Sequence, residues 1–256
     1  SEGLKDGDKV ALLSSSMPNW GVCYMAVVTS GMIAVPIMND FTSAELDLLI
    51  NHSEAKALLV SDKLFTKLSK DVVSKLNIVI RTKNLGIISQ TVKDRKGSVV
   101  IPKPEDLAAI IYTSGTTSQP KGVMLTHSNL AQQINYIYKL YPIGENDSML
   151  SVLPMSHTYE CSLGMLFPMS RGSNVTYLDR PPTVSVLLPA LKQVRPTIML
   201  IVPLIIEKIF KHQVLATFNS KAITRALYGW APTRRFLHRL AGKKLNKVFG
   251  GRIRFL

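Results

Sequence analysis

Cysteine, long apolar stretches and, toward the carboxyl end, acidic residues are scarce in this sequence of 256 residues. Its two cysteines, Cys23 and Cys161, lie among apolar or small residues, which predicts buried, reduced thiols in a cytoplasmic protein. The longest unbroken apolar run, residues 198–206, contains Pro203 and is far shorter than the ~20 residues that span a bilayer. The sequence therefore predicts neither a transmembrane protein nor a disulfide-stabilised secreted one.

Acidic residues are absent after Glu207, whereas lysines and arginines continue, and the chain carries a formal net charge of +14. Such a basic segment can face an anionic membrane, nucleic acid or an acidic part of the protein that lies elsewhere. No zinc-ligand spacing, helix-turn-helix pattern or RNA-binding aromatic signature accompanies it, so nucleic acid is not an expected partner. Peripheral contact with an anionic membrane, at its inner face, is the alternative to a solvated basic face.

Apolar strand patterns alternate with helical patterns along the chain, and no hairpin signal separates them. This alternation predicts an α/β fold of parallel strands flanked by helices on both faces. Strands are expected at residues 9–13, 32–39, 56–62, 77–82, 107–113, 147–154, 173–179 and 196–203. Helices are expected at residues 17–31, 42–55, 65–76, 128–140, 160–172, 184–194 and 204–218. Thr42 and Glu45 have the spacing of a capping box at the start of the second helix.

The alternating pattern loosens between residues 84 and 105, a polar segment with two prolines near its end. We interpret this segment as a connection between two α/β units. The sequence therefore predicts two partial parallel-sheet subdomains, one at residues 1–100 and one at residues 101–256.

Small hydroxyl residues and glycine gather at the carboxyl end of the expected strand 107–113 and directly after it. They are Thr113, Ser114, Gly115, Thr116, Thr117 and Ser118, followed by Pro120 and Lys121. Ligands collect beyond the carboxyl ends of parallel strands, and hydroxyls, backbone N–H groups and one lysine suit a polyphosphate. The loop is not a Walker A motif, because Gly122 rather than serine or threonine follows Lys121. A surface loop of small polar residues is the alternative interpretation.

Three strings resemble signatures of one enzyme superfamily. Residues 112–127, YTSGTTSQPKGVMLTH, are similar to the phosphate-binding signature of the adenylate-forming superfamily of acyl-CoA synthetases, luciferases and peptide-synthetase adenylation domains. Residues 151–160, SVLPMSHTYE, resemble its next signature. Residues 195–210, RPTIMLIVPLIIEKIF, resemble the matching segment of bacterial long-chain fatty-acid–CoA ligases. The sequence departs from the family at Ser118, where glycine is usual.

The resemblance implies an ATP-dependent enzyme that converts a fatty acid to acyl-AMP and then to a thioester with coenzyme A. The residues that would bind the ATP phosphates are Thr113, Ser114, Gly115, Thr116, Thr117 and Lys121. Thr113 would also help to hold Mg²⁺, and His157 would act in catalysis where the acyl group meets the phosphates. Gly164 and Ile206 match positions along the fatty-acid path, although helix packing explains Gly164 equally well.

The resemblance also implies that the chain is a fragment of a larger N-terminal domain. The family's adenine site, its magnesium-binding glutamate and its C-terminal catalytic domain, which would be a partner of this part, have no counterpart in residues 1–256. The fragment alone is therefore expected to be inactive. Two other functions stay open, a fatty-acyl-AMP ligase that loads a carrier protein and a non-catalytic basic module that binds membrane or nucleic acid.

Overall fold

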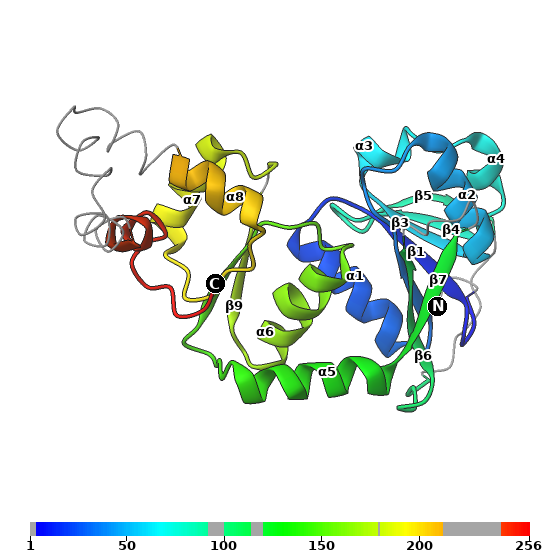
Figure 1. Ribbon diagram of the computed structural model, residues 1–256. Helices are drawn as coiled ribbons and strands as arrows, with labels where there is room; N and C mark the ends of the chain where they lie inside the picture. The colour runs from blue at the N-terminus through cyan, green and yellow to red at the C-terminus, as the bar shows by residue number, and fades with distance from the viewer. Residues whose placement is uncertain (1–3, 92–99, 114–119, 179, 212–241) are drawn as a thin grey trace. The chain divides into compact units, whose positions relative to one another are not determined.

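The computed structural model describes residues 4–91, 100–113, 120–178, 180–211 and 242–256 (Figure 1). The chain forms two compact units, which are described separately. The first comprises residues 1–140 and 154–166, and the second residues 141–153 and 167–256. No helix within the described ranges is both long and apolar enough to cross a membrane.

The first unit is built on a seven-stranded sheet in the order β5-β4-β3-β1-β2-β6-β7. Its strands are β1 (Lys9–Leu13), β2 (Ile33–Pro36), β3 (Ala57–Val60), β4 (Ile78–Arg81), β5 (Ile87–Gln90), β6 (Leu107–Thr113) and β7 (Lys121–Thr126). The five central strands are parallel, which confirms the predicted α/β class. However, β5 and β7 pair antiparallel at the two edges, contrary to the expectation of parallel strands alone. β5 also lies inside the segment that we interpreted as a connection.

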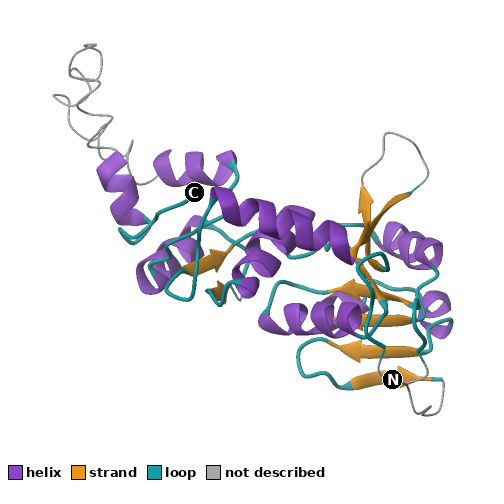
Figure 2. Cartoon of the chain, turned by 90° about the horizontal axis from the view of Figure 1, so that it is seen from below, coloured by secondary structure: helices purple, strands orange, loops and turns teal. Residues whose placement is uncertain are grey.

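Helices cover both faces of this sheet, as predicted. The helices of this unit are α1 (Pro18–Thr29), α2 (Ser43–Ser53), α3 (Asp62–Phe65), α4 (Lys70–Ser74), α5 (His127–Leu140), which buries no residue, and the π-helix η1 (Glu160–Leu166). Figure 1 shows α1 on one side of the strands and α2 to α4 on the other, and Figure 2 views the same sheet from below. Apolar side chains of α2, α3 and α4 pack on the sheet in one core cluster.

Local signals set where these helices begin. The capping box of α2 is confirmed, because Glu45 N donates to Thr42 Oγ1 and Thr42 N donates to Glu45 Oε2. The single helix expected at residues 65–76 was wrong, since the chain forms α3 and α4 instead. The Ser69 hydroxyl accepts a hydrogen bond from Val72 N at 3.3 Å, so it starts a new helix within that segment.

Both cysteines are buried and free in the first unit, as predicted. Burial raises the pKa of Cys23 to about 11 and that of Cys161 to about 12. Next to them, the buried rings of Trp20 and Tyr24 stack with centroids 5.5 Å apart. These thiols therefore belong to the core and are unreactive at neutral pH.

The second unit has a small parallel sheet. Its elements are β8 (Ser148–Ser151), α6 (Phe167–Ser170), β9 (Asn174–Tyr177), α7 (Val184–Val194) and α8 (Pro203–Phe210). The helix expected at residues 160–172 divides into η1 and α6, and the end of the helix expected at 204–218 lies outside the described residues.

The strand expected at residues 196–203 was wrong, because Ile198 makes only isolated bridges there, to Met149 and Phe255. Arg195 ends α7 in a left-handed conformation and Val202 is already the N-cap of α8, which leaves few residues for a strand.

The two compact units differ from the subdomains predicted at residues 1–100 and 101–256. β6 follows residue 100, yet it pairs with β2 through Ala34 and Ala109 and so belongs to the first sheet. Residues 154–166 also belong to the first unit, although the chain on either side of them lies in the second. The boundary between the two units is therefore set by contacts between residues that are far apart in the sequence.

Asp147 connects three parts of the second unit. Its side chain, 5% exposed, accepts hydrogen bonds from Thr197 Oγ1 at 2.7 Å, Gly144 N at 3.0 Å and Arg254 Nη1 at 2.8 Å. Burial alone would raise the pKa of Asp147, but these hydrogen bonds and the Arg254 charge outweigh burial and lower it. The carboxylate thus holds the chain before β8 against the segments around Thr197 and Arg254.

An Asp147→Asn variant is expected to lower the free energy of unfolding at pH 7 by about 1–2 kcal/mol, because it weakens charge-assisted hydrogen bonds. The folded-state pKa lies below the ordinary value of 3.8, so this stabilisation is present above 3.8 and is lost as the pH falls through the folded-state pKa. Urea unfolding of variant and parent should therefore converge at low pH. Asp62→Asn, which breaks an exposed pair with Arg81, is the control and should change stability little. Equal losses for both variants at pH 7 would contradict this prediction.

Candidate functional site

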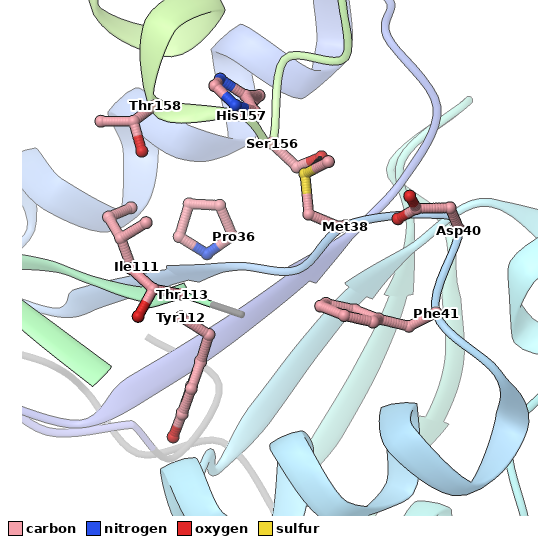
Figure 3. A pocket seen from close by; sticks show the side chains of 10 residues that line it. All are labelled: Pro36, Met38, Asp40, Phe41, Ile111, Tyr112, Thr113, Ser156, His157 and Thr158. Carbon is pink, nitrogen blue, oxygen red and sulfur yellow. Dashed lines mark hydrogen bonds between the residues drawn. The ribbon is translucent and has the colours of Figure 1, made fainter. Parts of the chain in front are cut away.

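A pocket of about 310 Å³ lies in the first unit at the carboxyl ends of β2 and β6 (Figure 3). Three chain segments, far apart in sequence, form its wall. The lining residues are Pro36, Met38, Asp40, Phe41, Ile111, Tyr112, Thr113, Ser156, His157 and Thr158. This edge of a parallel sheet is where α/β proteins bind ligands.

The segment after β2 supplies an apolar wall and one carboxylate, that of Asp40. Lys67 Nζ holds this segment from behind, because it donates to the backbone oxygens of Asn39 at 3.2 Å and Phe41 at 3.3 Å. The buried Ser156 hydroxyl meets Met38 Sδ at 3.5 Å and so links two of the three wall segments. Hydrogen bonds to Lys67 and Ser156 therefore hold the segment after β2 in place at the pocket wall.

His157 lies in a tight turn that fixes its ring. Its backbone N–H donates to Pro154 O at 2.9 Å, and its backbone oxygen accepts from Cys161 N at 2.9 Å. The Tyr159 backbone N–H donates to His157 Nδ1 at 3.2 Å. In the neutral ring the proton is then on Nε2, which can donate to an oxygen of a bound ligand.

Thr113 ends β6 and is the register partner of Lys121, the first residue of β7. The pairing therefore brings a hydroxyl and an ammonium group to the same end of the ladder. Tyr112, one residue earlier, lines the pocket, and burial together with the charge of Glu54 raises the pKa of its phenol. The phenol thus stays protonated at neutral pH and can donate a hydrogen bond.

The structure brings two of the predicted site residues, Thr113 and His157, to one pocket. The predicted phosphate-binding residues Ser114, Gly115, Thr116 and Thr117 lie outside the described residues. Gly164 and Ile206 do not line the pocket; Gly164 is in η1, and Ile206 is in α8 of the second unit.

Sequence reasoning missed Met38, Asp40, Phe41 and Tyr112. Three of these follow β2, so the rule that ligands bind beyond the carboxyl ends of parallel strands could have pointed to them.

Gly164 leaves room for a buried carboxyl group. A Cβ atom at this position would lie 2.5 Å from Glu160 Cδ and 2.6 Å from Glu160 Oε1. Glu160 is fully buried one turn earlier in η1, so its carboxyl group has little space to move. Helix packing, the alternative interpretation of this glycine, thus has a direct structural basis.

A Gly164→Ala variant is expected to lower the free energy of unfolding by about 1–3 kcal/mol, because the added methyl group overpacks the Glu160 site. If the full-length protein activates an acid, as the sequence resemblance implies, its KM for that acid should stay close to the parent value. Gly144→Ala, with no atom within 4 Å of the added Cβ, is the matched control for thermal unfolding. A raised KM for the acid with unchanged stability would instead support the substrate-path role.

The described part of the chain offers only part of a magnesium site. Thr113 presents a hydroxyl and Asp40 a carboxylate, which are ligands that Mg²⁺ accepts together with phosphate oxygens, but the two side chains lie on opposite sides of the pocket (Figure 3). Within the described ranges, no group of three or more histidine, cysteine, aspartate or glutamate side chains is placed to hold a metal. These residues therefore fit an ion that bound phosphates help to hold, and not a metal site of protein ligands alone.

The fold and the pocket together define an α/β protein with a ligand site beyond the carboxyl ends of a mostly parallel sheet. A family model described as AMP-binding enzyme matches residues 1–251, nearly the whole chain. The chain belongs to this family of adenylate-forming enzymes.

Relatives within the family differ in substrate. The chain is 33% identical over 183 residues to oxalate–CoA ligase of Arabidopsis thaliana, a match that covers 68% of this chain and 35% of that protein. It is 24% identical to fatty acyl-CoA synthetase A of Dictyostelium discoideum, over 99% of this chain and 42% of that protein. The chain thus spans less than half of the length of either relative.

Among solved structures, the fold matches the long-chain-fatty-acid-CoA ligase FadD1 of Archaeoglobus fulgidus with a TM-score of 0.72 at 23% identity. This match covers 99% of this chain and 52% of that one. At this identity, the similarity supports the fold of an adenylate-forming N-terminal domain.

Proposed function

We propose that the full-length protein is a cytoplasmic long-chain fatty-acid–CoA ligase that uses ATP and Mg²⁺. The observation that carries this proposal is the pocket in which Thr113, from the phosphate-binding signature, and His157, from the next signature, share a wall with apolar side chains. Family membership supports the reaction class, and the fatty acyl-CoA synthetase relative, aligned over nearly the whole chain, supports the substrate class.

In the proposed reaction, a carboxylate oxygen of the fatty acid attacks the α-phosphorus of ATP. The bond to the bridging oxygen of the β-phosphate breaks, and pyrophosphate leaves. The thiol of coenzyme A then loses its proton and attacks the acyl carbonyl, so that a thioester forms and AMP leaves. Holding the reactants in line and stabilising charge supply most of the rate enhancement in such a reaction.

The chain's own residues would position these groups. The Thr113 hydroxyl and the Lys121 ammonium would bind phosphate oxygens, together with Ser114, Gly115, Thr116 and Thr117. His157 Nε2–H would donate to an oxygen at the junction of acyl group and phosphate. Thr113 would help to hold Mg²⁺ together with the phosphates, and the ion would neutralise phosphate charge.

The acyl chain would contact the apolar part of the site, since each buried methylene contributes ~0.8 kcal/mol. Pro36, Met38, Phe41 and Ile111 supply such a surface in the pocket. Ile206 remains a proposed contact along the acyl path in the intact enzyme, whereas Gly164 joins it only if Gly164→Ala raises the KM for the acid. A site of this kind should favour a long alkyl chain over a short diacid.

The test is an assay of the full-length protein with ATP, Mg²⁺ and either palmitate or oxalate. We expect pyrophosphate release and acyl-CoA with palmitate, and loss of both when EDTA removes Mg²⁺. Residues 1–256 alone should give no turnover, because they span less than half of the length of the relatives. Failure to form an acyl-adenylate with any carboxylic acid would refute the reaction class, and preference for oxalate would refute the substrate.

Two other outcomes would identify the alternatives. Acyl transfer to a carrier protein but not to coenzyme A would indicate a fatty-acyl-AMP ligase. Strong, salt-sensitive binding to anionic liposomes or oligonucleotides, with no effect of ATP, would indicate a non-catalytic basic module. Liposome binding alongside ligase activity would support peripheral membrane contact, for which the basic residues after Glu207 are the candidates.

A further inference from the structure

A histidine of α2 holds the tyrosine in the pocket wall. The Tyr112 hydroxyl and His52 Nδ1 are 2.8 Å apart, although 60 positions separate the two residues in sequence. Their rings meet edge to face, with centroids 5.7 Å apart and an interplanar angle of 77°. Figure 3 shows the Tyr112 side chain extending from β6 away from His157. The pair thus combines a directional hydrogen bond with ring packing outside the site of the proposed chemistry.

The β6–β7 ladder leaves space for the Tyr112 ring. Tyr112 pairs with Gly122, and a Cβ atom there would lie 2.7 Å from Ile110 Cγ2 and 3.6 Å from Tyr112 Cε1. Glycine at 122 therefore lets the Ile110 and Tyr112 side chains lie close over the backbone of β7. The ring is fixed by this backbone and by His52.

The register partners of the carboxyl end of β6 lie in the edge strand β7. β2 pairs with β6 only at Ala34 and Ala109, so the later residues of β6 have ladder partners only in the edge strand β7. The next ladder pair after Tyr112 and Gly122 is Thr113 with Lys121. A tether at Tyr112 therefore acts directly beside the two described residues that would meet phosphate.

We propose that His52 and Tyr112 are positioning residues for ATP, because their hydrogen bond ties the end of β6 to α2 and fixes Thr113 and Lys121. This inference rests on the proposed function, since it assumes that ATP binds at Thr113. Because His52 is exposed at the end of α2, loss of the bond should disturb ATP binding more than the stability of the fold.

The experiment measures ATP binding to the full-length protein by calorimetry, without fatty acid, beside thermal unfolding without ATP. Tyr112→Phe and His52→Phe each keep a ring and remove the hydrogen bond, and His52→Asn can restore a partner, because its amide oxygen lies near the position of Nδ1. Each phenylalanine variant should raise the Kd for ATP about 3- to 10-fold, which corresponds to loss of one hydrogen bond. The double variant should do no more than the larger single change, and His52→Asn should bind ATP nearly as the parent does. Tyr136→Phe, on the exposed face of α5, is the control and should change nothing.

The inference is wrong if the phenylalanine variants bind ATP as the parent does, or if their effects add in the double variant. It is also wrong if the rise in Kd only follows a matching loss of folded protein. A parent protein that forms acyl-AMP while the variants are unaffected would overturn this inference and leave the proposed function intact. A parent protein that binds no ATP and forms no acyl-AMP would overturn both.

Discussion

A Thr113→Val variant of the full-length protein is expected to lose about 100-fold in kcat/KM for ATP, the effect of removing one donor that stabilises developing charge. Valine keeps the β-branched shape that suits the end of a strand, so β6 should form as before. The loss should fall mainly on kcat if the hydroxyl serves phosphate and Mg²⁺ in the transition state. Initial rates of pyrophosphate release over a range of ATP concentrations separate kcat from KM.

Thr176→Val is the control for this change. Thr176 is a half-buried strand residue in β9 of the second unit, so the substitution makes the same chemical change away from the pocket. It should leave kcat/KM for ATP at the parent value. Parent-like kinetics for Thr113→Val would remove Thr113 from the site.

A His157→Ala variant should likewise lose about 100-fold in kcat, because the Nε2–H donor to the reacting oxygens disappears. Two further variants separate the nitrogens. His157→Gln places an amide near the position of Nε2, whereas His157→Asn places an oxygen where Nδ1 accepts from Tyr159 N.

If Nε2 contacts the reactants, glutamine should retain more activity than asparagine in single-turnover assays of acyl-AMP formation. If His157 only shapes the turn, asparagine should retain more. Circular dichroism and thermal unfolding of all three variants control for loss of fold. Full activity of the alanine variant would exclude both roles.

The sequence predicts those elements whose signals are local. β1, β6 and α7 have the predicted bounds, and the capping box at Thr42 fixes the start of α2. The strands β5 and β7 were not predicted. Their antiparallel positions at the sheet edges depend on pairing with β4 and β6, which a local sequence pattern does not reveal. The separation of α3 from α4 depends on the N-cap Ser69. The apolar spacing of residues 65–76 fits one continuous helix and does not indicate this cap.

The candidate site was predictable where a strand end and a motif coincide. Thr113 and His157 each follow an expected strand and belong to recognisable strings, and they line one pocket. Asp40 and Phe41 belong to no motif and enter the wall only because β2 lies beside β6. The contact of Gly164 with Glu160 depends on the π-helical path of η1, which the pattern of residues 160–172 does not distinguish from an α-helix.

The three separate wall segments of the pocket have a consequence for how the protein is made. A ribosome releases residues 36–41 early, but the wall is complete only after Thr158 has been added. β2 gains its neighbour β6 once Thr113 has been added, whereas its carboxyl end lacks the turn that carries His157 until Thr158 follows. Closing such long chain segments costs entropy that only the finished contacts repay. The pocket is therefore completed only after all seven strands of the first sheet have been synthesised.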